Sequence, residues 1–112
     1  MPEKHFIEIE DSESVAAVHH KNKSSKWLFF CHGFGSNKKG SYKDRAEKAA
    51  EEGFNAVRFD FRGNGESDGE FKEQHLSDKI KDLKTCIEYF QPDKIYLFGM
   101  SFGGKVVFHA AE

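Results

Sequence analysis

Hydrophobic and polar positions follow two different periods along this chain, and the two periods predict strands and helices in turn. Apolar and polar residues alternate in 5–10, "HFIEIE", and more loosely in 14–19, "SVAAVH", with "DSE" between them. This pattern is typical of an antiparallel hairpin with one solvated face. Three later segments predict further strands: apolar runs at 26–32 and 94–100, each buried within a sheet, and 54–61 between them.

Helical spacing separates these strands. The segment 41–53 predicts a first helix, with Ser41 as its N-cap and Gly53 as its stop. Apolar residues at steps of four and three then predict a second helix, which Pro92 ends. The residues of this seam are Leu76, Ile80, Leu83, Ile87 and Phe90. A third helix begins in the last segment, "FGGKVVFHAAE".

The alternation of strands and helices predicts the fold class. Strands separated by helices of about a dozen residues imply right-handed crossovers and a mostly parallel sheet with helices on both faces. With the antiparallel hairpin at its start, the sheet is expected in the order first, second, fourth, third, fifth. We therefore predict an α/β fold in which residues 1–112 form part of a single domain.

Composition and charge narrow the function. Hydrophobic residues make up 38% of the 112 and charged residues 32%, which is typical of a globular protein. The net charge of −2 disfavours a nucleic-acid partner, and the apolar runs are too short to span a membrane. The charged amino terminus does not resemble a signal peptide, and two cysteines, Cys31 and Cys86, favour packing roles in a reducing compartment. The predicted location is the cytoplasm.

The segment 96–108, "YLFGMSFGGKVVF", fits two kinds of site. One is a phosphate-binding loop that runs from Gly99 to Lys105. Such a loop places a Ser or Thr hydroxyl on Mg²⁺ after its lysine, but here Val106 follows. The only acid after Ser101 is the last residue, so no later carboxylate is available to hold the metal. The sequence therefore disfavours nucleotide binding through Lys105.

The other kind of site is a nucleophile elbow, a sharp strand-to-helix turn with a serine at its tip. Gly99 and Gly103 flank Ser101 by two residues, where glycines relieve the crowding that such a turn causes. Ser101 is then expected at the carboxyl edge of the sheet, where open α/β sheets bind ligands. The following helix would direct backbone N–H groups and its positive dipole at an oxyanion.

Two further motifs accompany this turn in a fixed order. His32-Gly33-Phe34 follows the third strand, and "DFRGNGES", Asp60 to Ser67, follows the fourth. With the elbow, these motifs make the chain resemble the α/β-hydrolase superfamily, in particular its esterase and serine-peptidase-like members. The resemblance covers essentially the whole chain. It implies that Ser101 is the nucleophile and that the backbone N–H groups of Phe34 and Phe102 form the oxyanion hole, with Gly33, Gly99 and Gly103 as structural positions.

The resemblance also implies a substrate and a mechanism. Members of this superfamily hydrolyse a small-molecule ester, or an amide or thioester, through an acyl-serine. No cofactor is expected, because the glycines of "GNGESDG" do not have dinucleotide-binding spacing and no helix opens directly from them. No spacing of His, Cys, Asp and Glu indicates a metal site.

The superfamily's catalytic acid and histidine follow the serine, and this chain supplies neither in a usable place. His109 lies eight residues along the helix that leads away from Ser101, and His32 is expected to be a structural hydrogen-bonding residue. His5, His75 and the pair at 19–20 have no chemical partner in sequence. The chain therefore predicts an incomplete α/β-hydrolase fold, the amino-terminal part of the domain. Three alternatives remain: a truncated hydrolase, a split enzyme whose second chain brings Asp or Glu and His, and a non-catalytic remnant or interaction module.

Overall fold

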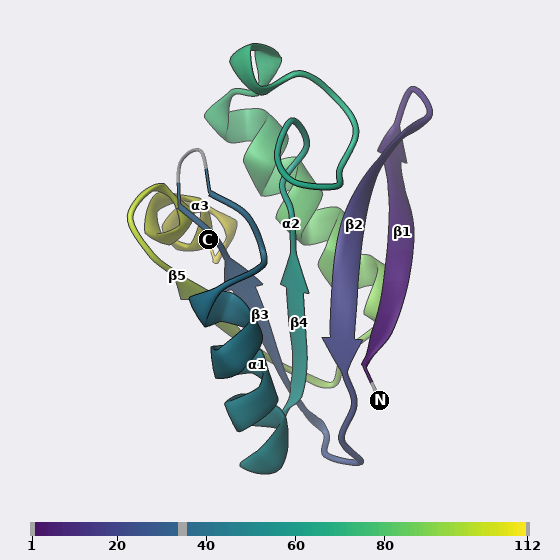
Figure 1. Cartoon of the computed structure of the whole chain (residues 1–112), viewed down its shortest axis with the longest axis vertical. Coiled ribbons are helices and arrows are strands. Elements are labelled where there is room, and N and C mark those ends of the chain that lie inside the picture. The colour runs from purple at the N-terminus through teal and green to yellow at the C-terminus, as the bar shows by residue number, and fades with distance from the viewer. Residues whose placement is uncertain (1, 34–35, 112) are drawn as a thin grey trace.

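The computed structural model describes residues 2–33 and 36–111, which form a five-stranded sheet with helices on both faces (Figure 1). The sheet order is β1-β2-β4-β3-β5, as the strand–helix alternation predicts. In chain order the elements are β1 (Glu3–Glu10), β2 (Glu13–His20), β3 (Lys26–Cys31), α1 (Ser41–Glu51), β4 (Asn55–Phe59), the short 3₁₀ helix η1 (Phe71–Glu73), α2 (Leu76–Phe90), β5 (Lys94–Gly99) and α3 (Phe102–Ala110).

The direction of the strands divides the sheet. β2 is antiparallel to both β1 and β4, whereas β3 is parallel to β4 and to β5. The β1–β2 turn places Asp11 and Ser12 at positive φ, 46° and 64°, which matches the right-handed twist of a two-residue hairpin. The carboxyl ends of the parallel strands β3, β4 and β5 therefore meet at one edge, which we call the carboxyl edge, and their first residues lie at the opposite amino edge.

The prediction of a hairpin with one solvated face is wrong for its second strand. Six consecutive residues of β2, from Val15 to His20, are buried, so both faces of the strand are covered. The reason is topological: β2 lies between β1 and β4 and is an interior strand of the sheet. β1 is the edge strand, and exposed residues, Phe6 and Glu8 among them, alternate along it with buried or half-buried ones.

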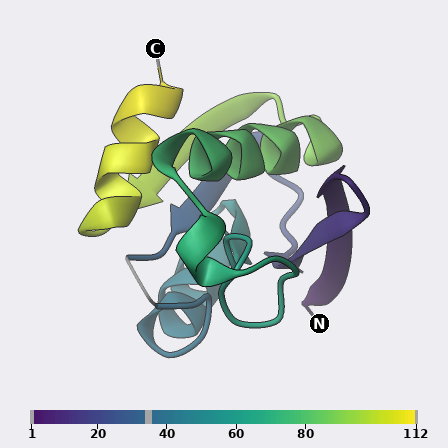
Figure 2. The same ribbon diagram turned by 90° about the horizontal axis from the view of Figure 1, so that it is seen from above.

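Helices cover the two faces of the sheet separately (Figure 2). On one face α1 places Tyr42 and Ala46 against Phe30 and Ala56. On the other face α2 and α3 cover a larger core that includes Leu83 and contacts the predicted seam of α2. No helix within the described residues is long and apolar enough to cross a membrane.

The ends of the first two helices show how backbone conformation stops them. Ser41 is the first helical residue of α1 and not its N-cap; that place is taken by Gly40, whose φ of 64° a serine adopts only with strain. Gly53 follows α1 with a φ of 100°, as expected of a helix stop. α2 ends with Gln91 in the left-handed conformation, directly before Pro92.

β5 is the strand whose burial differs most from the prediction. Its sequence, "KIYLFG", predicts a strand buried within the sheet, yet Ile95 is 47% exposed and Tyr96 45% exposed. β5 pairs with β3 on one side and forms the edge of the described sheet. A strand with this apolar sequence is a template for pairing with further chain, because its outer N–H and C=O groups point away from the sheet.

Candidate functional site at the carboxyl edge

Ser101 occupies a strained turn between β5 and α3. β5 ends at Gly99 and α3 begins at Phe102, so the chain reverses over two residues. Ser101 has φ 56° and ψ −121°, a combination that costs a non-glycine residue on the order of 1–3 kcal/mol. Its side chain is exposed at the carboxyl edge. This is the backbone conformation expected of a nucleophile elbow.

Glycines allow the turn to pack this tightly. A Cβ atom on Gly99 would collide with the backbone of Gly103, and one on Gly103 would collide with the carbonyl oxygens of Cys31 and His32. β3 and α3 therefore approach each other with backbone against backbone. Side chains at these two positions would push α3 away from the sheet and move Ser101 with it.

The loop after β3 lies directly beside Ser101. A Cβ atom built on Gly33 would be 3.4 Å from the Cβ atom of Ser101 and 3.4 Å from the carbonyl oxygen of Met100. Phe34, one of the two predicted oxyanion donors, lies outside the described residues. The other, Phe102, is the first residue of α3, so its N–H lies at the positive end of the helix dipole.

The same geometry argues against the phosphate-binding loop. A phosphate cradle needs several loop residues between strand and helix, and here only Met100 and Ser101 lie between β5 and α3. Gly103 and Gly104 are helical, and Lys105 is the fourth residue of α3 with its side chain exposed. The glycines therefore serve close packing and do not form a loop around an anion.

His32 is a structural residue, as predicted. Its Nε2 accepts a hydrogen bond from the Phe61 N–H at 3.1 Å, and its Nδ1 donates to the Gly33 carbonyl oxygen at 2.8 Å. Both ring nitrogens are thereby used, and burial lowers the pKa of the imidazole. His32 fixes the path of the loops after β3 and β4 and is not available to take a proton from Ser101.

His109 is also unsuited to act as the base. It lies in the last turn of α3, eight residues after Ser101. At 1.5 Å per residue, this separation is about 12 Å along the helix axis. The histidine of a Ser–His pair must therefore come from outside α3.

The "DFRGNGES" loop after β4 is held by a buried acid. Asp60 is fully buried and accepts hydrogen bonds from the Lys38 N–H, the Lys38 ammonium and the Glu66 N–H, at 2.7, 2.7 and 3.0 Å. Lys38 also donates to Glu66 at 2.7 Å, and these contacts lower the pKa of Glu66 to about 2. Gly65 leaves room for the Asp60 carboxylate, which a side chain there would displace. Asp60 thus ties this loop to the loop before α1.

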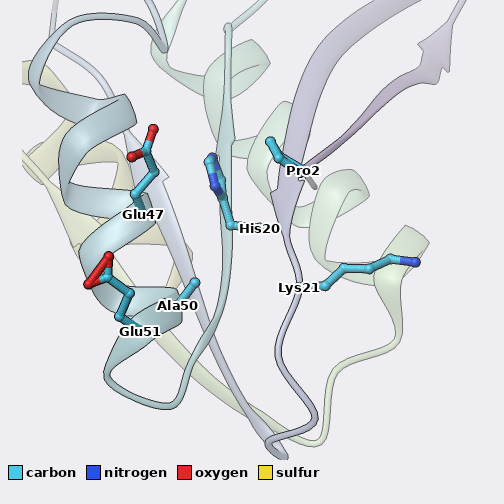
Figure 3. A pocket seen from close by; sticks show the side chains of 6 residues that line it. All are labelled: Pro2, His20, Lys21, Glu47, Ala50 and Glu51. Atoms are coloured by element: carbon cyan, nitrogen blue, oxygen red, sulfur yellow. The ribbon is translucent and has the colours of Figure 1, made fainter.

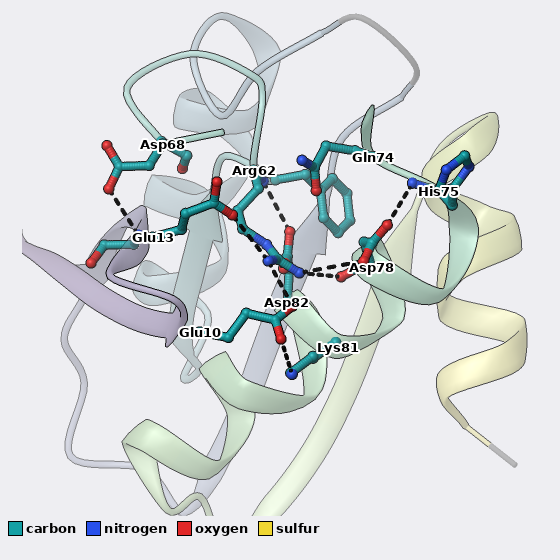
Figure 4. A network of polar contacts seen from close by, with 12 residues as sticks. Glu10, Glu13, Arg62, Asp68, Gln74, His75, Asp78, Lys81 and Asp82 are labelled. Atoms are coloured by element: carbon teal, nitrogen blue, oxygen red, sulfur yellow. Dashed lines mark hydrogen bonds and ion pairs between the residues drawn. The ribbon is translucent and has the colours of Figure 1, made fainter. Parts of the chain in front are cut away.

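Arg62 of the same loop joins the hairpin to α2 (Figure 4). Its Nε donates to Asp82 at 2.7 Å, and its Nη1 donates to Glu10 at 2.9 Å and Glu13 at 3.2 Å. Burial raises the pKa of Asp82 to about 6, although the guanidinium and backbone N–H of Arg62 oppose that shift. Two charged side chains of this motif, Asp60 and Arg62, are therefore buried and connect neighbouring elements.

The two cysteines are packing residues, as their sequence context predicts. Cys31 ends β3 and Cys86 lies on α2; both are free thiols, both are fully buried, and burial raises the pKa of each thiol. A thiol held in its protonated form is a poor nucleophile and metal ligand.

The histidines of the hairpin have partners that sequence reasoning missed. His20 accepts a hydrogen bond from Arg58 Nε at 2.9 Å, and His19 is hydrogen-bonded through Nε2 to Asn55 at 2.9 Å. Burial lowers the pKa of both imidazoles. The antiparallel pairing of β2 with β4 supplies these contacts, because it places Val57 opposite His19 and Ala56 opposite His20. Local sequence patterns do not reveal this long-range register.

A hollow of about 270 Å³ lies at the amino edge, between the end of β2 and the last turns of α1 (Figure 3). His20, Lys21, Glu47 and Glu51 contribute polar groups to it. β2 runs antiparallel to β4, so the end of β2 lies beside the beginning of β4, across the sheet from Ser101. This hollow is therefore separate from the site at the carboxyl edge.

Known proteins resemble this chain over most of its length. The family model of serine aminopeptidase, S33, matches residues 22–112. The bovine mitochondrial palmitoyl-protein thioesterase ABHD10 is 32% identical over 107 residues, which cover 95% of this chain and 35% of that protein. Among solved structures, mouse α/β hydrolase domain-containing protein 10 superimposes with a TM-score of 0.88 at 27% identity, over 97% of this chain and 44% of that one. Est1E from Butyrivibrio proteoclasticus, solved with bound ferulic acid, gives a TM-score of 0.85 at 27% identity, over 96% and 46%.

All of these matches cover a much larger share of this chain than of the relative. Almost all of this chain is matched, but it spans about a third of the length of the curated relatives and less than half of the solved chains. The matched part holds the five-stranded sheet and the serine turn at its carboxyl edge. The chain belongs to the serine aminopeptidase S33 family of α/β hydrolases.

Proposed function

We propose that this chain carries the nucleophile half of a serine hydrolase that cleaves carboxylic esters, or thioesters and amides, through an acyl-serine at Ser101. Residues 1–112 are then the amino-terminal part of one hydrolase domain, and the catalytic acid and histidine come from a further part of the protein or from a second chain. The observation that carries the proposal is the strained, exposed Ser101 at the start of α3, with Gly33 packed beside it.

The chemistry follows from what lies around Ser101. A histidine from the completing part accepts the hydroxyl proton while Oγ attacks the substrate carbonyl carbon. The backbone N–H groups of Phe34 and Phe102 bind the oxyanion, and the dipole of α3 favours its negative charge. The histidine returns the proton to the leaving alcohol, and water then hydrolyses the acyl-serine in the same way.

Among these reactions we favour cleavage of esters and thioesters, because the names of two relatives refer to such reactions. One curated relative is named a palmitoyl-protein thioesterase, and a solved neighbour with 27% identity is named the Pyrococcus furiosus esterase Pf2001. Both names point to acyl transfer from an oxygen or sulfur leaving group. An activated ester such as a p-nitrophenyl acyl ester is therefore the first substrate to use.

The test is to measure hydrolysis of p-nitrophenyl esters by the chain alone and by the chain combined with the completing part of the hydrolase domain. We expect almost no turnover from the chain alone, because an unassisted hydroxyl is a weak nucleophile. The combination should turn over, and Ser101→Ala should lower kcat by about 10⁶, which is the range known for loss of a triad serine. A fluorophosphonate probe should label Ser101 only in the combination.

Ser77→Ala is the matched control, because Ser77 is an exposed serine on α2, away from the elbow. It should leave both hydrolysis and labelling unchanged. Equal activity of Ser101→Ala and the unmodified combination would overturn the proposal. Robust, Ser101-dependent turnover by the chain alone would overturn the part that assigns the base to another segment.

A further inference from the structure

Three potential metal ligands meet at the amino edge, on the face of the sheet that α2 covers. Glu3 and His5 lie two residues apart on β1, so their side chains leave the same face of the strand. The hairpin register places Glu3 directly opposite His19 of β2. One ligand atom from each residue lies within 4.8 Å of the others, and His5 Nε2 is 3.6 Å from the Glu3 carboxylate.

In both His5 and His19, one ring nitrogen is hydrogen-bonded to a neighbouring side chain, and the other ring nitrogen is left to bind an ion. His5 Nδ1 is 2.9 Å from the Tyr89 hydroxyl, and His5 Nε2 is buried without a hydrogen-bond partner in the described structure. His19 Nε2 is 2.9 Å from Asn55 Oδ1, which leaves Nδ1 as the nitrogen to face an ion. Histidine ligands of metals are usually fixed through the second ring nitrogen in this way.

Aromatic packing holds the two imidazoles in place. His19 stacks on Trp27 with ring centroids 4.7 Å apart. His5 meets the edges of Phe90 and Tyr89, at 5.2 and 5.5 Å. Both rings are therefore oriented before any ion binds. The buried, unpartnered Nε2 of His5 costs folding free energy, and a bound ion would remove that cost.

Glu3 supplies the adjustable ligand. Half of its side chain is exposed, and its Oε2 pairs with the Lys21 ammonium at 2.9 Å while Oε1 faces His5. Ligand atoms around tetrahedral zinc lie about 3.3 Å apart, given bonds of about 2.0–2.1 Å. Rotation of the exposed carboxylate toward the imidazoles brings the cluster to that spacing, and Lys21, which is also exposed, can move with Oε2 or release it.

We propose that Glu3, His5 and His19 form a binding site for a borderline divalent cation, with zinc as its best occupant. Two imidazole nitrogens and one carboxylate oxygen suit Zn²⁺ far better than Mg²⁺ or Ca²⁺, which prefer all-oxygen ligands. Three protein ligands leave a fourth position open to water on the solvent side of Glu3.

The proposed cation site lies far from Ser101, so a bound ion would act on the structure and would take no part in the hydrolase chemistry. His19 stacks on Trp27 near the start of β3, whereas the loop at Gly33 beside Ser101 follows the end of that strand. The site and Ser101 are thus separated by the length of β3, on the order of 15 Å at 3.3 Å per residue. A bound ion would clamp the edge strand β1 to β2, and the hydrogen bond from His5 would extend that clamp to α2 through Tyr89.

Isothermal titration of the chelator-treated chain with ZnCl₂ tests the proposal, with the protein made without a histidine tag. We expect one zinc ion per chain and a melting temperature that rises with zinc concentration. MgCl₂ should produce neither effect. Titration with Co²⁺ should give the visible absorption of a four-coordinate ion.

Substitutions identify the ligands. Glu3→Gln and His5→Gln should each weaken zinc binding by at least about tenfold, and Tyr89→Phe should weaken it by about tenfold because it removes an outer partner. The side chains of Glu3 and Tyr89 are half exposed, so the Glu3→Gln and Tyr89→Phe variants should fold. Far-ultraviolet circular dichroism checks the folding of each variant. His75→Gln, at an exposed histidine outside the cluster, should bind zinc as before. Absence of stoichiometric zinc binding, or equal affinity in all four variants, would overturn the site.

Discussion

The turns that leave β4 and β5 lie at the same edge of the sheet, and both are rich in glycine, yet they are built in opposite ways. The loop after β4 buries Asp60 and Arg62 and satisfies both with several charged hydrogen bonds. The turn after β5 presents an exposed Ser101 in a strained backbone conformation. The loop after β4 uses charged side chains to hold three elements together. The turn after β5 positions one hydroxyl through close backbone packing and through backbone hydrogen bonds from Gly103 and Gly104.

The difference shows that two glycine-rich motifs at the same edge of the sheet serve different purposes. The residues of "DFRGNGES" are needed for the architecture around the site, because removing a partner leaves a charge buried and unpaired. The residues of the turn after β5 set the position of one hydroxyl group, and the energetic cost of that turn is backbone strain at Ser101. Loss of a charged partner in the loop after β4 should therefore act mainly on stability, and a change of Ser101 itself should act mainly on activity.

The largest expected effect on stability comes from the loop after β4. Asp60→Ala should lower the free energy of unfolding by about 3–5 kcal/mol, because it leaves the Lys38 ammonium buried without its main partner. Urea denaturation measures the change. Glu52→Ala is the matched control, since Glu52 pairs with Lys48 at 3.8 Å with both side chains exposed, and its loss should change stability by less than about 0.5 kcal/mol. A loss of similar size in both variants would contradict the assigned role of the buried acid.

In the turn after β5, one added methyl group should also lower the free energy of unfolding, where the backbones of β3 and α3 are in contact. Gly103→Ala places a Cβ atom against the carbonyl oxygens of Cys31 and His32 and should cost about 1–3 kcal/mol by overpacking. Gly104→Ala tests the explanation, because its Cβ atom would make ordinary contacts with the Gly99 carbonyl group, at 3.4 Å from the oxygen and 3.8 Å from the carbon. That variant should be neutral, or up to about 1 kcal/mol more stable, because alanine favours a helix. Thermal unfolding of the two variants side by side decides the matter; equal melting temperatures would refute the close-packing argument.

Relief of strain at Ser101 should stabilise the fold and abolish the chemistry. Ser101→Gly removes the penalty of φ 56° and should gain about 1 kcal/mol net of the extra chain entropy of glycine. Ser101→Ala keeps the Cβ atom and should leave stability within about 0.5 kcal/mol of the unmodified chain. Both variants should be inactive in the completed enzyme. Denaturation curves that place Ser101→Gly below Ser101→Ala in stability would show that the turn is not strained.

The most gradual effect is a dependence of stability on pH that belongs to Asp82. Its pKa is raised from 3.8 to about 6 by burial, so the folded chain holds this proton more tightly than the unfolded chain does. The contribution is fully present below pH 3.8 and is lost as pH rises to about 6, by at most about 1.4 kcal/mol per pH unit. We expect the stability of the unmodified chain relative to Asp82→Asn to fall between pH 4.5 and 6, where Glu66, with its pKa of about 2, stays ionised. A difference that stays constant over this range would mean that Arg62 cancels the effect of burial.

The sequence was sufficient for most of the fold because the patterns that set it are local. Alternation, apolar runs and helical spacing each depend on a few neighbouring residues, and the order of the five strands followed from them. The error at Ser41 also has a local cause, since Gly40 before it takes a positive φ that a sequence pattern for capping serines does not weigh.

What the sequence could not provide were contacts that depend on register and neighbours. Both faces of β2 are buried because β4 pairs beside it, and β5 is exposed because β3 flanks it on one side only. The meeting of Glu3 with His19 is a product of strand pairing. At the site, the spacing of Gly99 and Gly103 around Ser101 gave the turn, while the hydrogen bonds that occupy His32 became apparent only in three dimensions.

The order in which strands are made has a consequence for synthesis of the chain on the ribosome. β3 leaves the exit tunnel early, but its two neighbours in the sheet, β4 and β5, are both translated later. At about 5–20 residues per second, the delay between Cys31 and its partner Gly99 is roughly 3–14 s. Through that interval one edge of "WLFFC" stays unpaired, so the nascent chain exposes an apolar strand that can pair with other chains before the serine turn has formed.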